Sequence, residues 1–223
     1  MAAGAGRRKA RFRKVYAVAD ADARLVLRCQ SNDLAAFNDI VARYQHRVYG
    51  YVCRMVGCTP DAEDLTQEVF VKAYHGIRSF QSRASLNTWL YRIATNLCID
   101  YVRRSARCKG LTESLNAEYS GDDEESEREL PDVRYDPLTV ALHEELRERL
   151  DEAIAALPPK LRAVLLLHDI EGLPYDEVAR AVGCPLGTVK SRLFHARMSV
   201  RERLAPYLVG LPAPMAARLA ESR

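Results

Sequence analysis

Residues 176–198 are predicted to form two short helices joined by a tight turn, and this stretch restricts the fold more than any other. Gly183 follows the first helix, where glycine adopts the left-handed backbone of a helix stop at little cost. Pro185 suits the first turn of the second helix, because a missing N–H there loses no hydrogen bond. Apolar residues then recur at three- and four-residue spacing, at Leu186, Val189, Leu193, Ala196 and Val200. This pattern predicts a helix-turn-helix.

The other face of the second helix has the chemistry of a DNA-binding surface. At about 100 degrees per residue, the side chains that point away from the apolar stripe are Gly187, Lys190, Ser191, Phe194, Met198 and Arg201, with Arg197 at its edge. In a major groove, Phe meets a thymine methyl group and Lys or Ser reaches base edges. Arg192 and His195, on the opposite flank, are placed to reach phosphates. The alternative is a helical hairpin of an ordinary bundle, in which a neighbouring helix covers Phe194.

Charge is distributed unevenly along the 223-residue chain, whose formal net charge is only +3. Residues 7–14 carry six basic side chains, whereas residues 110–137 carry ten acidic and two basic ones, a net charge of minus eight. Such asymmetry suggests contact with a polyanion at one place and an acidic, solvated or nucleic-acid-like segment at another. No apolar run approaches the roughly 18 to 20 residues of a membrane span. We therefore expect a cytoplasmic protein with no stable membrane insertion.

The six cysteines show neither C-x-x-C spacing nor a nearby histidine cluster; they are Cys29, Cys53, Cys58, Cys98, Cys108 and Cys184. A zinc site and a disulfide framework are both unsupported. We expect no metal and no cofactor, and most of these thiols to lie in helices or the core. Redox sensing by one of them stays open.

Helical periodicity and composition divide the chain into five parts and predict an all-α fold of two small domains. The parts are a flexible basic arm (1–20), a first helical domain (21–109), an acidic flexible linker (110–137), a helix-turn-helix domain (138–205) and a C-terminal extension (206–223).

The second long helix of the first domain follows Thr59 and Pro60, with Thr59 predicted as its cap. Its buried line is predicted at Leu65, Val69, Ala73 and Ile77. Beside that line lies an acidic strip, Asp61, Asp64 and Glu68, with Gln67 next to it. Such a strip docks a basic helix or is plain solvated surface, and the residues alone favour solvated surface.

A third long helix is predicted to begin after Ser85, its cap. Thr88, Arg92, Thr95, Ile99 and Arg103 are expected to face outward. Trp89, at the boundary, either stacks on an unpaired base with Arg92 and Arg103 nearby or anchors the core. The residues do not decide between the two roles.

Two separate stretches resemble the bacterial sigma-70-type transcription initiation factors, specifically the small extracytoplasmic-function (ECF) group. The first stretch is DAEDLTQEVFVKAY at 61–74 with TWLYRIATN at 88–96, and the second is LPPKLRAVLLL at 157–167 with GLPYDEVA at 172–179 and GTVKSRL at 187–193. Both occur in family order, with a linker between them.

The resemblance implies a promoter-specificity subunit that has no catalytic residues and is not an enzyme. Its partners would be core RNA polymerase, through the beta-prime and beta subunits, promoter DNA and an anti-sigma factor. The acidic strip of Asp61, Asp64, Gln67 and Glu68 would dock on the beta-prime coiled coil, which reverses the preference for a solvated surface.

The resemblance also assigns two sets of DNA contacts. The minus-ten element, including a flipped base held by the 79–85 loop, would be bound by Ser79, Phe80, Gln81, Ser82, Arg83, Ser85, Trp89, Arg92, Asn96, Asp100, Arg103 and Arg104. The minus-thirty-five element would be bound by Gly187, Thr188, Lys190, Ser191, Arg192, Phe194, His195 and Arg197. His195 stands where arginine is usual in the family, which predicts a weaker or pH-dependent phosphate contact.

Two rival functions differ in what they predict. A stand-alone helix-turn-helix regulator would bind duplex DNA by itself, whereas sigma factors generally need core polymerase. An enzyme is poorly supported, because no nucleophile elbow, phosphate loop or metal-ligand spacing occurs. The acidic linker would thread toward the polymerase active centre. Neutralising residues 122–127 should then alter promoter escape, and unchanged abortive transcription would contradict this.

Overall fold

The computed structural model describes residues 21–81, 84–112 and 137–210. The predicted basic arm, Ser82, Arg83, most of the acidic linker and most of the C-terminal extension lie outside these ranges. Within them every regular element is helical, which confirms the all-α prediction. None of the described helices is long and apolar enough to cross a membrane.

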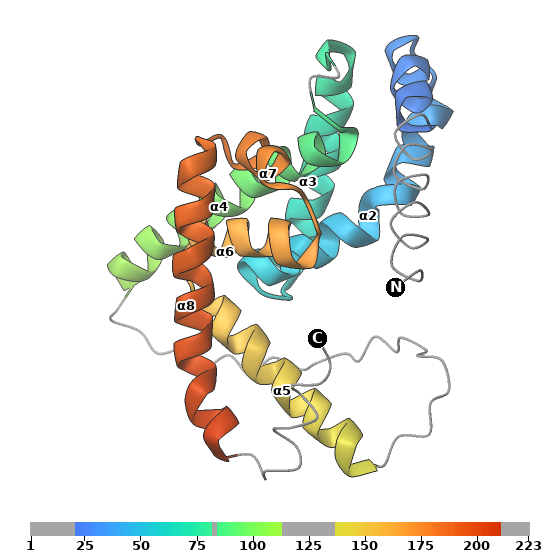
Figure 1. The fold of residues 1–223 in the computed structure, drawn as a ribbon. Helices are drawn as coiled ribbons and strands as arrows, with labels where there is room; N and C mark the ends of the chain where they lie inside the picture. Colours follow the sequence, from blue (N-terminus) through green and yellow to red (C-terminus); the bar gives the residue numbers. More distant parts are fainter. Residues whose placement is uncertain (1–20, 82–83, 113–136, 211–223) are drawn as a thin grey trace.

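The amino-terminal half forms one layer of helices around a shared core (Figure 1). Asp33 caps the first long helix, because its carboxylate accepts a hydrogen bond of 3.2 Å from the Ala36 amide. Gly57, with φ of 100°, ends that helix. The elements are a helix over 21–30, α2 (Leu34–Val56), α3 (Pro60–Gly76), the short η1 (Ile77–Ser79) and α4 (Leu86–Thr112).

The carboxyl-terminal half forms a second layer that contains the predicted helix-turn-helix. Gly183 ends α7 with φ of 63° and ψ of 43°, the left-handed conformation expected of it. The last helix continues through Pro206 to Gly210, past the boundary predicted at residue 205. The elements are α5 (Pro137–Ala155), α6 (Pro159–Leu165), the π-helical turn η2 (Leu166–Ile170), α7 (Tyr175–Val182) and α8 (Leu186–Gly210).

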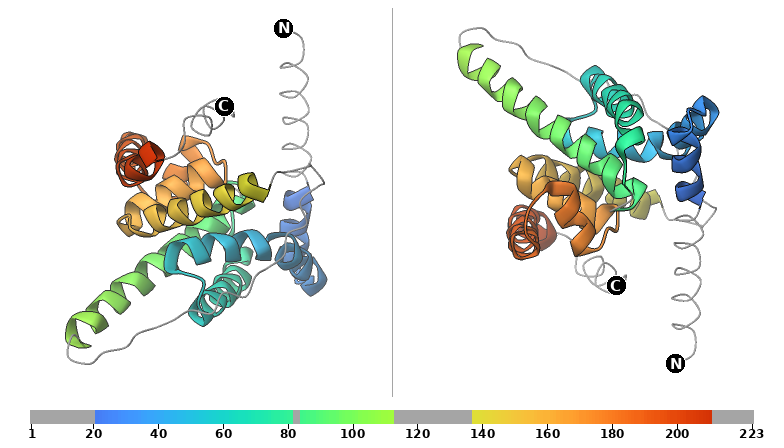
Figure 2. Two further views of the ribbon diagram at one scale, coloured as in Figure 1. Left: turned by 90° about the horizontal axis from the view of Figure 1, so that it is seen from below. Right: turned by 90° about the horizontal axis from the view of Figure 1, so that it is seen from above.

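The two layers pack face to face, as both views in Figure 2 show. Helix α7 lies against α4, and α5 and α6 lie against α2. The Arg162 guanidinium of α6 donates to the Met55 carbonyl of α2 over 2.5 Å. Buried residues of both halves form one continuous hydrophobic cluster. Sequence periodicity predicted each half, but not this contact between them.

Helix α4 has more buried surface than its periodicity predicted. The expectation that Thr88 and Thr95 face solvent is wrong, since they are 1% and 0% exposed. The Thr95 hydroxyl hydrogen-bonds the Tyr51 hydroxyl of α2 over 2.7 Å, and Thr88 lies under α7. The physical reason is that α4 lies between the two layers and buries side chains on more than one face.

One further local prediction holds only in part, and another is wrong. Thr59 occupies the cap position of α3, but its hydroxyl makes no capping hydrogen bond and is buried without a partner among the described residues. Leu186, assigned to the buried stripe of α8, is 44% exposed, because it is the first residue of that helix and the buried stripe begins one turn later at Val189. Along α3, the predicted buried line of Leu65, Val69, Ala73 and Ile77 is confirmed.

Candidate nucleic-acid interface

The amino-terminal half of α8 presents a basic and aromatic face to solvent. Val189, Leu193 and Ala196 are buried on the opposite side, against the rest of the second layer. Phe194 is 63% exposed, so no neighbouring helix covers it, and the hairpin alternative is contradicted at this residue. The exposed members of the predicted set are Gly187, Lys190, Ser191, Phe194, His195 and Arg197, whereas Thr188 and Arg192 are half-buried.

A hollow of about 300 Å³ runs beside this face, lined by Tyr175, Lys190, Leu193, Phe194, Arg197, Met198 and Arg201. The Tyr175 ring stacks on His168 with a centroid separation of 4.3 Å. His168 is itself held, because its Nδ1 lies 2.8 Å from the Leu173 carbonyl. The start of α7 therefore packs firmly on η2. The hollow is lined by both aromatic and cationic side chains, which are suited to the bases and phosphates of DNA.

Two predicted DNA contacts already have intramolecular partners. Arg197 makes a bidentate ion pair with Asp169, at 2.5 and 3.0 Å. The Arg192 guanidinium donates to the Cys184 sulfur in the turn between α7 and α8, over 3.6 Å. A phosphate bound by Arg197 would have to compete with Asp169.

Along α4, a second row of polar side chains faces solvent. Arg92, Asn96, Asp100 and Arg103 are exposed and recur every three or four residues, so they share one face of the helix. The Arg103 guanidinium lies 3.5 Å from the Asp100 carboxylate, and Arg104 is exposed beside them. The structure therefore brings together the helical part of the predicted minus-ten set.

The loop before α4 is held on the indole of Trp89. The Phe80 ring lies 5.0 Å from the Trp89 ring, between centroids. A Cβ added at Gly76 would lie 3.0 Å from that indole, so the absence of a side chain at Gly76 lets the indole pack closely against the backbone of α3. The Gln30 amide donates to the Phe80 carbonyl over 2.9 Å. Trp89 thus anchors the loop, and its remaining surface lines an open hollow with Arg92, Gly183 and Cys184.

Helix α7 covers the start of α4 through a carboxylate that the sequence did not single out. Glu177 accepts hydrogen bonds from the Ser85 hydroxyl over 3.2 Å and from the Thr88 hydroxyl over 2.5 Å. Ser85 also caps α4, because its oxygen accepts from the Thr88 amide over 3.1 Å, as predicted. No periodic signal marks Glu177, since its partners lie 89 and 92 positions away in the chain.

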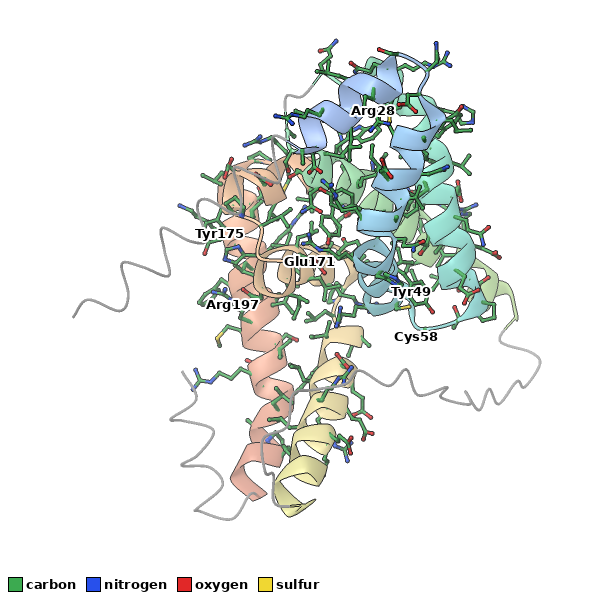
Figure 3. All side chains as sticks on the ribbon, turned by 90° about the vertical axis from the view of Figure 1, so that its right-hand side faces the viewer. Arg28, Tyr49, Cys58, Glu171, Tyr175 and Arg197 are labelled. Carbon is green, nitrogen blue, oxygen red and sulfur yellow. The ribbon has the colours of Figure 1, made fainter. Side chains whose placement is uncertain are left out.

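A second carboxylate, Glu171, lies between the layers and is also absent from the predicted set. Figure 3 shows Glu171 between the two layers. It accepts hydrogen bonds from the Tyr91 hydroxyl of α4 and from Arg47 of α2, the latter over 3.3 Å. Burial, followed by the charge of Glu171, raises the pKa of Tyr91 well above its ordinary value. Glu171 therefore joins three helical segments in one hydrogen-bonded cluster.

The acidic strip on α3 lies on the outer surface of the first layer. Asp64 and Gln67 are exposed, and Glu68 is half-buried beside Lys72 at 3.2 Å. Asp61 accepts a hydrogen bond of 2.7 Å from the Tyr101 hydroxyl of α4. The strip is thus a continuous surface, and near its middle the Asp64 carboxylate and the Gln67 amide are exposed and unpaired within the part of the chain that the structure describes.

Comparison with known proteins identifies the family to which both surfaces belong. Residues 40–108 match the family model of Sigma-70 region 2, and residues 147–200 match that of Sigma-70 region 4. The RNA polymerase sigma-H factor of Pseudomonas aeruginosa is 35% identical over 187 residues, covering 84% of this chain and 95% of that protein. The chain belongs to the ECF group of sigma-70 factors. The ECF sigma-E factor of Escherichia coli K12 is 38% identical over 184 residues, which cover 82% of this sigma factor and 94% of that one.

Two solved structures have the same fold. The sigma factor RpoE of Bartonella quintana, in complex with the anti-sigma factor NepR, aligns with a TM-score of 0.58 at 22% identity, covering 76% of this chain and 96% of that one. CnrH, in complex with the cytosolic domain of CnrY, aligns with a TM-score of 0.59 at 24% identity, covering 84% and 99%. Because the sequence identities are only 22% and 24%, these two similarities describe the fold alone.

Family membership settles the class of function. This sigma factor has both regions of a promoter-recognising subunit, so a stand-alone helix-turn-helix regulator is not favoured. Sigma factors are non-enzymatic initiation factors. The resemblance drawn from the sequence motifs is therefore confirmed at the level of family and function.

Proposed function

We propose that this sigma factor directs core RNA polymerase to promoters through three surfaces, one for the polymerase and two for DNA. The observation that carries the proposal is the face of α8, where Phe194, Lys190 and Ser191 are exposed while the opposite stripe is buried. In a major groove this face reads the minus-thirty-five element, with His195 and Arg197 toward the phosphates.

The exposed row on α4 is proposed to bind the opened minus-ten element. Arg92, Asn96 and Arg103 offer hydrogen bonds and positive charge to one strand, and the 79–85 loop takes the extruded base. Capture of that base offsets part of the unpairing cost, which is a few kcal/mol per base. Trp89 contributes by holding the loop as well as by stacking, since it packs on Phe80.

The acidic strip on α3 is proposed to dock on the coiled coil of the beta-prime subunit, with the beta subunit as a further contact. Asp64 and Gln67 are exposed and form no hydrogen bond or ion pair with another described residue, whereas Asp61 is held by Tyr101. We therefore assign the larger part of the docking energy to Asp64, Gln67 and Glu68.

Use of both promoter elements requires the two halves to separate. Positions minus ten and minus thirty-five are about 25 base pairs apart, or about 85 Å of B-form DNA at about 3.4 Å per base pair. Here the helix-turn-helix lies directly on α4 through Glu177. The 25 residue steps from Thr112 to Pro137 span about 82 to 90 Å at full extension, at about 3.3 to 3.6 Å per residue. The chain is thus long enough to open to promoter length.

The test is transcription in vitro with core polymerase on a library of genomic fragments. Specific initiation should require this protein, and Asp64→Ala and Lys190→Ala should each reduce it. Asp64→Ala should weaken binding to core, whereas Lys190→Ala should weaken only promoter recognition. Glu202→Ala and Lys160→Ala, exposed and outside the proposed surfaces, are the matched controls. No specific initiation with an active core preparation would refute the proposal, as would tight duplex binding without core.

An anti-sigma protein that covers the α3 strip is proposed as the regulator. The proposal is consistent with the fold shared with RpoE, whose structure contains the anti-sigma factor NepR. A candidate must compete with core polymerase for the wild-type protein and lose affinity for Asp64→Ala. A candidate that binds without blocking core would not be this regulator.

A further inference from the structure

A hollow of about 510 Å³ opens where the start of α4 meets the turn between α7 and α8. Trp89 and Arg92 of α4 line it from one layer, and Arg180, Gly183 and Cys184 line it from the other. Helix α7 lies against α4 in Figure 1. The volume lies within the range of about 300 to 1,000 Å³ that small-molecule sites occupy. Because its walls come from both layers, this interlayer hollow is complete only while the layers are in contact.

The aromatic wall of the interlayer hollow is the indole of Trp89. Phe80 packs on the indole at 5.0 Å between ring centroids, and the backbone of Gly76 lies close to it, so the ring is held in place. Trp89 is half-buried, and its remaining surface lines the hollow. In the other layer, no atom beyond the chain neighbours lies within 4 Å of the position that a Cβ of Gly183 would take. The hollow therefore has room for a flat ring beside the indole.

Two guanidinium groups give the interlayer hollow positive charge. Arg92 is exposed and forms no hydrogen bond or ion pair with another described residue. Arg180 is also exposed, and it forms an ion pair with Asp176 one turn earlier in α7. A guanidinium has five N–H donors in a fork, which lets one arginine hold a carboxylate and a phosphate together. Glu177 already accepts a hydrogen bond from Thr88, a further residue of the hollow.

We infer that the interlayer hollow binds a purine nucleotide. The base stacks on Trp89, because an aromatic side chain offers a stacking platform to any nucleobase. The phosphate pairs with Arg92 and Arg180, because the fork of a guanidinium matches two phosphate oxygens. A purine fits better than a pyrimidine, since its two fused rings cover more of the indole.

The occupant is a free nucleotide and not the promoter strand, and this step rests on the proposed function. Trp89 and Arg92 are also assigned to the minus-ten element, but promoter elements about 85 Å apart require α7 to leave α4. The hollow then loses Arg180 and Gly183, so a ligand that uses both walls binds only the closed form. Such a ligand shifts the chain toward that form. At about ten times its dissociation constant, it favours the closed form by about 11-fold.

Fluorescence reports binding directly, because Trp89 is the single tryptophan of the chain. The full-length protein is titrated with AMP or GMP, with excitation at the red edge of the indole band, where nucleotides do not absorb. We expect saturable quenching with a dissociation constant below about 1 mM. Ribose 5-phosphate, which has no base to stack, should leave the emission unchanged. Absence of saturable quenching by both nucleotides, or equal binding of ribose 5-phosphate in equilibrium dialysis, would overturn the proposal.

The arginine of the helix-turn-helix wall is tested by substitution. Arg180→Ala should weaken nucleotide binding by about tenfold or more, since a hydrogen bond to a charged group is lost. Arg180→Lys, which keeps the charge, should lose less. Arg147→Ala, at an exposed arginine of α5 outside the hollow, is the matched control and should bind as the wild type does. Unaltered affinity in Arg180→Ala would remove the second wall from the site and overturn the proposal.

A single-stranded deoxyoligonucleotide distinguishes the two sources of a nucleotide. Its binding should not depend on Arg180, because the strand uses the face of α4 after α7 has left. If Arg180→Ala weakens the oligonucleotide and no mononucleotide binds, the hollow belongs to the promoter strand and the proposal is overturned.

Formation of the promoter complex separates the nucleotide site from the proposed function on which its effect rests. Core polymerase, this protein and a promoter fragment are mixed without substrates for transcription. Saturating AMP or GMP should reduce the complex of the wild-type protein by up to about 11-fold, and should leave that of Arg180→Ala nearly unchanged. An undiminished wild-type complex, despite saturable quenching, would overturn the inhibitory effect. If no complex forms even without nucleotide, the proposed function fails while the quenching result still stands.

Discussion

The Glu177 carboxylate of α7 accepts a 2.5 Å hydrogen bond from the Thr88 hydroxyl of α4, and Thr88 is 1% exposed. This contact joins the helix-turn-helix to the helix proposed to bind the minus-ten element. It places the two promoter-reading regions side by side in the chain without polymerase.

Removal of this carboxylate should destabilise the protein. Glu177→Ala removes the acceptor shared by the Thr88 and Ser85 hydroxyls, and the buried Thr88 hydroxyl then has only the Ser85 oxygen, 2.7 Å away, so we expect a loss of about 1 kcal/mol. Urea denaturation should show that loss in the free energy of unfolding, and the exposed Glu202→Ala should show little change. Equal stability of the two variants would mean that Thr88 finds another partner.

A covalent link at the same place should hold the protein closed. With Thr88→Cys and Glu177→Cys together, oxidation should join α4 to α7 and abolish promoter opening by the reconstituted holoenzyme, because the halves cannot reach elements about 85 Å apart. Reductant should restore activity. Each single variant, treated identically, controls for oxidation of the native thiols. Full activity of the joined protein would contradict the proposed opening.

Alkaline pH should lower the free energy of unfolding, in part because the hydrogen bond from Tyr91 to Glu171 between the layers is lost. Burial raises the pKa of Tyr91, and also of Tyr44 and Tyr51, above the ordinary value of about 10. The folded state then keeps these protons longer than the unfolded state, so their stabilising effect is complete below about pH 10 and is lost as the pH rises further. Denaturation between pH 8 and 11 should show falling stability above pH 10, with a shallower fall in Tyr91→Phe. A flat profile would contradict the assignment.

Release of Arg197 should strengthen DNA binding. Asp169→Asn removes the carboxylate that holds Arg197 in an ion pair, so the guanidinium becomes available to a phosphate. The slope of log affinity against log salt should steepen by about 0.9, the value for one phosphate on duplex DNA. Binding of the holoenzyme to promoter fragments at several salt concentrations measures it. The change should disappear when Arg197→Ala is combined with Asp169→Asn.

The exposed Phe194 should matter for DNA and not for folding. Because it is 63% exposed, Phe194→Ala should leave the free energy of unfolding within about 0.5 kcal/mol of the wild type. Promoter affinity of the holoenzyme should fall by about 1.5 to 3 kcal/mol if the ring is buried against a base in the major groove. Leu193→Ala, two percent exposed on the other face, should show the reverse, with a large loss of stability. Unaltered promoter affinity in Phe194→Ala would exclude the ring from the interface.

Local sequence determined the elements and several of their ends. Asp33 and Ser85 cap their helices, and Gly183 ends α7, because each acts on backbone groups a few residues away. The three-and-four spacing of Val189, Leu193 and Ala196 also sufficed to identify the outward face of α8. The family motifs are short runs of neighbouring residues, so they could be identified without the tertiary structure. They are the basis for the function proposed for each surface.

Only the tertiary structure decided how the two halves meet. Thr88 and Thr95 have the polarity of surface residues, and their burial depends on Glu177 and Tyr51, which lie far away in the chain. The same holds for Glu171 between Tyr91 and Arg47 and for Arg197 paired with Asp169. Periodicity records which face of one helix is apolar; it carries no information on a hydrogen bond between side chains brought together by the packing of two layers.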